Sequence, residues 1–153
     1  VPLRFIDYSN DSKRQNQFLL AISNEQIAKY LYKYGIVPRK EFKLTFPNWL
    51  DNNLLSHFIR GYLDGDGFIT NNPKEKRANI TGTENLLLGI KNILEEQLNI
   101  HFSIYSPHNK DTNTRTLAVA GGNQVKKFLD YLYKDADLYI ERKYDRYYNM
   151  YCA

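Results

Sequence analysis

The stretch LLSHFIRGYLDGDG, residues Leu54–Gly67, decides the fold of this chain. Its apolar residues recur in pairs four positions apart, at Leu54, Leu55, Phe58, Ile59, Tyr62 and Leu63. This spacing predicts an amphipathic helix with one broad apolar face, and Asn48 or Asp51 would cap its start. Gly61 and Gly65 lie on one side of the helix, where the missing side chains would let another backbone approach closely.

The helix ends in Asp64-Gly65-Asp66-Gly67, and a strand follows from Phe68. Carboxylates at a helix C-terminus meet the negative end of the helix dipole, which argues against a purely structural role for both aspartates. A cation held by Asp66 and the last free carbonyl groups would resolve this conflict. An ordinary Asp-Gly turn between helix and strand is the alternative interpretation.

The nine residues Ile59–Gly67, IRGYLDGDG, resemble the LAGLIDADG motif, the signature helix of the homing endonucleases. One glycine, both aspartates and the final glycine match, whereas Arg60 replaces the usual small second residue. The resemblance implies that two such helices pack together through small residues such as Gly61 and Gly65. It also implies that Asp66 is a catalytic residue and the metal ligand, with Mg²⁺ as the cofactor, and that Asp64 supports the helix end.

The chain downstream of the motif alternates helical and strand patterns. Helices are predicted over residues 83–99, 124–133 and 138–151, and strands over 67–71, 77–82, 100–105 and 116–120. The order α-β-β-α-β-β-α-α indicates an α+β protein with antiparallel hairpins. It resembles the LAGLIDADG domain, an αββαββα repeat with a saddle-shaped antiparallel sheet, and we predict that fold for residues 47–153.

Residues 1–46 contain a shorter version of the same pattern. Strands are predicted at 1–8 and 17–22, and a helix capped by Ser23 runs to Gly35. The strand and helix at 18–31 resemble those at 116–129, with Gln26 matching Gln124 at an offset of 98 residues. We predict that residues 1–46 are the C-terminal part of a first LAGLIDADG-like repeat whose own motif helix is missing. A chance similarity is the alternative.

The composition favours some classes of binding partner over others. The net charge of +4 and the pI near 9.0 favour an anionic partner. The single cysteine, Cys152, rules out an internal disulfide and fits an intracellular setting such as cytoplasm, nucleoid or organelle. No apolar run approaches membrane-spanning length, so no membrane partner is expected. The three histidines have no metal-ligand spacing.

The family also places a basic residue near each centre, on the segment after the second hairpin. The resemblance points to Lys143 as a further catalytic residue, with Arg142 as the alternate and Lys40 as its counterpart in the first repeat. Such a lysine polarises the attacking water or offsets phosphate charge. The solvated face of a last helix is the alternative interpretation. Where the family often has a polar residue at the end of the second strand, this chain has Gly82, which leaves the water-positioning role unassigned.

The two hairpins are expected to read double-stranded DNA, because in the family the sheet lies along the major groove and one face of each strand reaches base edges. The residues predicted to contact bases or phosphates are Thr70, Asn71, Lys74, Lys76, Arg77, Asn79, Thr81, Ser103, Tyr105, His108, Lys110 and Arg115. An ordinary exposed polar side chain is the alternative at each position.

These features together predict a site-specific, metal-dependent DNA endonuclease of the LAGLIDADG homing type, encoded in an intron, an intein or a free-standing gene. Because the chain holds one motif helix, cleavage requires a second one from a homodimer partner or from an upstream segment. Two alternatives stay open: a non-cleaving DNA-binding regulator and an RNA splicing maturase on the same scaffold.

Overall fold

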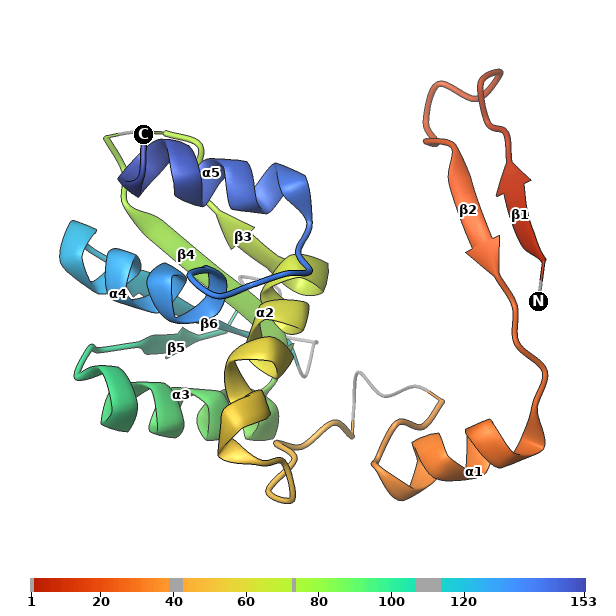
Figure 1. Ribbon diagram of the computed structural model, residues 1–153, viewed down its shortest axis with the longest axis horizontal. Coiled ribbons are helices and arrows are strands. Elements are labelled where there is room, and N and C mark those ends of the chain that lie inside the picture. Colours follow the sequence, from red (N-terminus) through yellow and green to blue (C-terminus); the bar gives the residue numbers. More distant parts are fainter. Residues whose placement is uncertain (1, 39–42, 73, 107–113) are drawn as a thin grey trace. The chain divides into compact units, whose positions relative to one another are not determined.

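The computed structural model describes residues 2–38, 43–72, 74–106 and 114–153. The chain divides into two compact units, unit 1 (Val1–Ile36) and unit 2 (Val37–Ala153). Figure 1 shows the elements of both units, which are described separately below. None of the helices in the described ranges is long and apolar enough to span a membrane.

Unit 1 is a hairpin followed by a helix. Strand β1 (Leu3–Ile6) pairs antiparallel with β2 (Gln17–Leu20), and helix α1 (Glu25–Lys33) follows. The helix begins one residue later than predicted, because the Asn24 side chain, and not Ser23, accepts the Ile27 amide at 3.0 Å. Gly35 follows the helix with φ at +78°, the left-handed conformation expected of a glycine in that place.

Unit 2 begins with a short 3₁₀ turn, η2 (Asn52–Leu54), and the motif helix α2 (Leu55–Asp66). Neither Asn48 nor Asp51 caps α2, since η2 occupies the residues just before it and Leu54 stands at the cap position. The first hairpin consists of β3 (Gly67–Ile69) and β4 (Arg77–Thr83), and helix α3 (Glu84–Leu98) follows it. Thr83 caps α3 by accepting the Leu86 amide, and Asn99 ends it with φ at +48°.

The second half of unit 2 repeats this order. Strands β5 (Ser103–Tyr105) and β6 (Thr114–Ala120) lead into α4 (Gly122–Tyr133) and α5 (Glu141–Tyr151). All neighbouring strands of the sheet are antiparallel, in the order β3-β4-β6-β5. The predicted α+β fold of the αββαββα type is confirmed, with α5 starting at Glu141 and not at residue 138.

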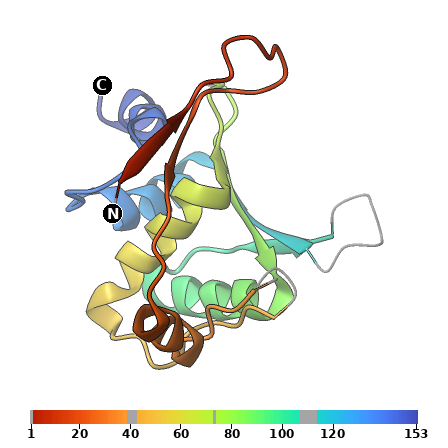
Figure 2. The ribbon, with the colours of Figure 1, turned by 90° about the vertical axis from the view of Figure 1, so that its right-hand side faces the viewer.

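Helices α2, α3 and α4 cover one face of this sheet, as Figure 2 shows. Residues at every second position of the two central strands face the helices, and four of them are fully buried: Ala78, Ile80, Leu117 and Val119. They join a core that includes Leu63 of α2, Leu87 of α3 and Phe128 of α4. The residues between them lie on the opposite face, called the open face below.

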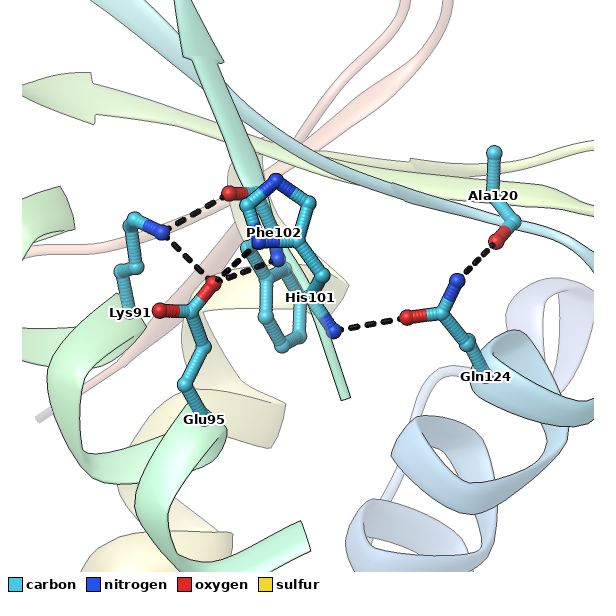
Figure 3. Close-up of polar contacts among 6 residues, drawn as sticks. All are labelled: Lys91, Glu95, His101, Phe102, Ala120 and Gln124. Atoms are coloured by element: carbon cyan, nitrogen blue, oxygen red, sulfur yellow. Dashed lines mark hydrogen bonds and ion pairs between the residues drawn. The ribbon is translucent and has the colours of Figure 1, made fainter. Parts of the chain in front are cut away.

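A polar network fixes the chain where it enters β5 (Figure 3). The Glu95 carboxylate accepts the Phe102 amide at 2.7 Å and the Lys91 ammonium at 2.6 Å, and Lys91 also donates to the Phe102 carbonyl. The Gln124 amide group accepts the His101 amide and donates to the Ala120 carbonyl. These bonds connect α3 and α4 to the second hairpin, and they fix the position of the residues just before β5 relative to both helices.

Candidate active site and nucleic-acid interface

The last turn of α2 separates its two aspartates. The Asp64 side chain is buried, and its carboxylate accepts the Tyr133 hydroxyl at 2.6 Å and the Ile140 amide at 3.1 Å. Burial and this contact with Asp64 raise the pKa of Tyr133 well above its ordinary value of 10.0, so the phenol stays protonated. Asp64 therefore anchors α4 and the start of α5 to the motif helix.

Asp66, in contrast to Asp64, is exposed. Its carboxylate makes no hydrogen bond or ion pair with any residue that the structure describes. It lines a cavity of about 360 Å³ whose other walls are Leu44, Tyr62, Thr81, Gly82, Thr83 and Thr114. Burial and the charge of Asp66 raise the pKa of Tyr62, which keeps that phenol neutral. Both carboxylate oxygens of Asp66 are thus available to a ligand.

The cavity is suited to a hydrated cation. Mg²⁺ binds through one or two carboxylates, keeps several waters and takes its remaining ligands from phosphate. Among the residues that line the cavity only Asp66 has a carboxylate, and the Thr83 hydroxyl is already bonded to the Leu44 carbonyl and the Leu86 amide. Within the described ranges no group of three or more His, Cys, Asp or Glu side chains is placed to hold a metal. Asp66 is thus the one carboxylate that the described residues supply to this cavity.

Lys143 lies directly beneath the end of α2. It is 2% exposed, and its ammonium donates to the backbone carbonyls of Leu63, Asp64 and Gly67, the last two at 2.7 Å. Burial, together with the charges of Arg142 and Arg146, lowers the pKa of Lys143. An ammonium has three N–H donors, and all three are used.

In this structure Lys143 positions the end of α2, and no N–H remains for a water or a phosphate; its catalytic role stays a prediction. It also supplies the cation that the helix dipole required: an internal ammonium neutralises the carbonyl end of α2. Arg142, the alternate, is exposed on α5. Lys40 lies outside the described residues.

Two arginines serve backbone carbonyls in the same way. Arg60 is 6% exposed and donates to the Leu132 and Leu138 carbonyls at 2.9 Å. The residue that departs from the family motif therefore connects α2 to the end of α4 and to the segment that follows it. Arg146 donates to the Ile69 carbonyl at 2.6 Å. Part of the positive charge of unit 2 is thus used within the fold and does not face a partner.

Five predicted DNA contacts lie on the open face of the sheet. The register pairs Asn79 with Ala118 and Thr81 with Thr116, opposite in direction to the buried row of Ile80 and Leu117. Arg77, Ser103 and Tyr105 share this face. Phe68 and Thr116 lie there too and were missed, Phe68 because it is apolar and Thr116 because Arg115 was assigned to this face in its place.

Two predicted contacts are not exposed on this face. The Thr70 amide donates to the Arg77 carbonyl across the hairpin, but Thr70 is 2% exposed and its hydroxyl oxygen accepts the Asn72 amide within the turn. Arg115 is opposite Gly82, in the row of strand residues that faces the helices, and its guanidinium lies 3.4 Å from the Glu84 carboxylate. Successive side chains of a strand point to opposite faces, so an error of one residue in the predicted register of β6 placed Arg115 on the wrong face.

The turn residues differ among themselves. Asn71 and Lys74 are exposed, as expected for phosphate contacts, whereas Lys76 is half-buried with its ammonium 5.3 Å from the centre of the Tyr151 ring. His108 and Lys110 lie outside the described residues. Gly82 lines the Asp66 cavity, and a Cβ atom added there would lie 3.2 Å from the Leu86 side chain and 3.4 Å from that of Leu87.

Gly61 and Gly65 form an open strip on α2. Both are exposed, and a methyl group added at either position would meet no atom within 4 Å. No packing contact inside the described part of the chain therefore requires these glycines. Their predicted use in a helix pair stays a prediction.

Comparisons with known proteins agree with this fold. A family model described as a LAGLIDADG-like domain matches residues 53–133. No curated protein sequence matches the chain. Among solved structures, the N-terminal LAGLIDADG domain of DUF199/WhiA is similar with a TM-score of 0.56 and 21% identity, covering 94% of this chain and 63% of that one.

Two further solved structures are similar over a smaller part of the chain. Full-length DUF199/WhiA from Thermatoga maritima has a TM-score of 0.50 and 22% identity, over 67% of this chain and 33% of that one. An archaeal intron-encoded homing endonuclease, I-Vdi141I, complexed with DNA, has a TM-score of 0.44 and 20% identity, over 63% and 64%. The chain spans less than two thirds of the length of each of these proteins. Because the family model matches more than half of its residues, the chain belongs to the LAGLIDADG-like domain family.

Proposed function

We propose that this chain is a DNA-binding subunit or segment of a LAGLIDADG endonuclease, which cleaves double-stranded DNA when a second motif helix is present. The observation that carries the proposal is the difference in burial and bonding between the two aspartates of α2. Asp64 is buried and bonded, whereas Asp66 is exposed, without a bonding partner in the described chain, at a cavity beside the sheet. A structural turn alone does not need the second carboxylate.

In this proposal Asp66 holds Mg²⁺, which when bound offsets the charge of the scissile phosphate and lowers the pKa of a bound water. Lys143 keeps the end of α2 fixed, so the Asp66 carboxylate stays at the cavity mouth. Thr81 lines both the cavity and the open face, so a duplex lying on that face would bring its backbone to Asp66. Hydrolysis then breaks one phosphorus–oxygen bond, with water supplying the new oxygen and the leaving oxygen taking a proton.

A second motif helix would supply a second carboxylate and a second attack point. One carboxylate per chain is a small ligand set for a cleavage centre, and two strands require two attack points. A second helix packed on the Gly61 and Gly65 strip would bring a second Asp66-like carboxylate close to the first. The partner is a second copy of the chain or another LAGLIDADG-like segment.

A second candidate is a DNA-binding protein that does not cleave. The single carboxylate that the described residues supply to the cavity favours it. This candidate keeps the open face as the DNA-binding surface and assigns no chemistry to Asp66.

The test compares wild type with Asp66→Asn, using Asp135→Asn as an exposed carboxylate control on unit 2. Binding to a pool of random duplexes is measured with Ca²⁺, cleavage is measured with Mg²⁺, and mass in solution establishes whether two motif helices are present. We expect cleavage by the assembled wild type and the control, and binding without cleavage by Asp66→Asn. An assembled wild type that binds duplexes and never cleaves them would establish the second candidate.

A further inference from the structure

The described residues of unit 1 include many apolar side chains but form no buried core. No residue of β1, β2 or α1 is buried. One face of the hairpin carries Leu3 and Phe5 opposite Leu20 and Phe18, and all four are more than half exposed. Such a continuous apolar surface in a folded segment marks a place where another protein element packs.

The similarity between residues 18–31 and 116–129 indicates which kind of element would pack there. The offset of 98 residues that matches Gln26 with Gln124 also matches the apolar face of α1 with that of α4. The four pairs are Ile27 with Val125, Tyr30 with Phe128, Leu31 with Leu129, and Tyr34 with Leu132. In α4 all four side chains are at most 1% exposed, whereas their counterparts, three in α1 and Tyr34 at its C-cap, are 41% to 63% exposed.

The cover of α4 is visible in unit 2. Helices α2, α3 and α5 and strands β4 and β6 contact α4, and the four residues share one core cluster with residues of α2, α3 and β4. Of these elements, α2, β4 and α3 belong to residues 55–98, the α-β-β-α half that precedes the second hairpin. The corresponding apolar residues of α1 could therefore pack against an α-β-β-α half of the same kind. Among the described residues of unit 1, no element buries them.

We propose that unit 1 is an incomplete LAGLIDADG-like repeat whose exposed hairpin and α1 face dock an α-β-β-α half built like residues 55–98. The partner is thus a protein segment with an amphipathic helix at each end of a hairpin, and it covers Ile27, Tyr30 and Leu31 as residues 55–98 cover Val125, Phe128 and Leu129. The proposal rests on the fold of the family and does not depend on cleavage.

The first test uses matched leucines in the full chain. Leu129→Ala removes a fully buried side chain and should lower the midpoint of thermal unfolding by about 10 °C. Leu31→Ala, at the corresponding position of α1, should shift it by less than about 1 °C, because the side chain is not packed. A loss with Leu31→Ala as large as that with Leu129→Ala would show that the face is already covered in the chain as it stands, and would overturn the proposal.

The second test supplies the missing half. A copy of residues 47–100 is joined in front of Leu3, the place that the offset of 98 assigns to it. We expect amide hydrogen exchange of α1 to slow by at least about tenfold, and Leu31→Ala to become destabilising in the fusion. Unchanged exchange in α1 while the added copy is itself protected would overturn the proposal. Neither test measures DNA, so its failure leaves the nuclease proposal standing.

Discussion

Replacing Lys143 with methionine removes the ammonium that closes the motif helix and leaves a side chain of similar length. In the wild type this ammonium donates to three carbonyls, those of Leu63, Asp64 and Gly67. The Leu63 carbonyl also accepts the Gly67 amide, so it keeps one partner in the variant. The carbonyls of Asp64 and Gly67 lose their bonds to Lys143 in a place that water reaches poorly.

The expected cost follows from those two carbonyls. A buried acceptor left without a partner costs about 1 to 3 kcal/mol. Removal of the buried charge recovers part of this, because the ammonium no longer has to be desolvated. We expect Lys143→Met to lower the free energy of unfolding by about 2 to 3 kcal/mol, or the midpoint of thermal unfolding by roughly 8 to 12 °C for a unit of this size.

The assay is thermal and urea unfolding at pH 7, followed by far-ultraviolet circular dichroism. Arg142→Met is the matched control, since it removes a neighbouring cation that is exposed on the same helix. It should change the free energy of unfolding by less than about 0.5 kcal/mol. If Lys143→Met is as stable as the wild type, or if Arg142→Met costs as much, Lys143 does not hold the helix end.

Three further predictions concern packing, charge and pairing. Gly89→Ala should destabilise unit 2 by about 1 to 3 kcal/mol, because the added methyl would overlap the Phe46 side chain; wild-type stability in urea would show that Phe46 does not pack there. Burial raises the pKa of Glu95, but hydrogen bonds from Lys91 and the Phe102 amide and the charges of Lys91 and His101 outweigh it and lower that pKa below 4.5. Its stabilisation is therefore present above about pH 4.5 and is lost as the pH falls through the folded-state pKa, so Glu95→Gln should flatten the loss of stability in acid; an unchanged acid profile would contradict this. Gly61→Leu should leave the unfolding midpoint unchanged or raised, because the site is open within the chain, while abolishing any pairing of motif helices in sedimentation; persistence of the pair would place the contact elsewhere.

Local signals in the sequence predict local structure well. The paired apolar spacing gives α2, and Thr83, Asn99 and Gly35 mark helix ends where the structure has them. Each of these features depends on a few adjacent residues. The α-β-β-α-β-β-α-α order could therefore be predicted from the chain and from its resemblance to the family.

Long-range partners were not predictable in the same way. Lys143 bonds to carbonyls about 76 to 80 residues earlier, and nothing in its neighbourhood distinguishes it from the exposed Arg142. Arg60 likewise reaches Leu132 and Leu138, which no local pattern indicates. The face of Arg115 required the exact strand register, which periodicity fixes only to within one or two residues.

The central claim, that the open face of the sheet binds duplex DNA beside Asp66, is tested most directly by two arginines on paired strands. Arg77 lies on the open face, and Arg115 lies on the face toward the helices; each also pairs with a glutamate, so each replacement by alanine removes one cation and one ion pair. The measurement is the affinity for random duplex DNA in Ca²⁺ as a function of salt. The account predicts that Arg77→Ala weakens binding about tenfold and reduces the salt slope by about 1, whereas Arg115→Ala binds within about twofold of wild type. Equal losses, or a larger loss with Arg115→Ala, would contradict it.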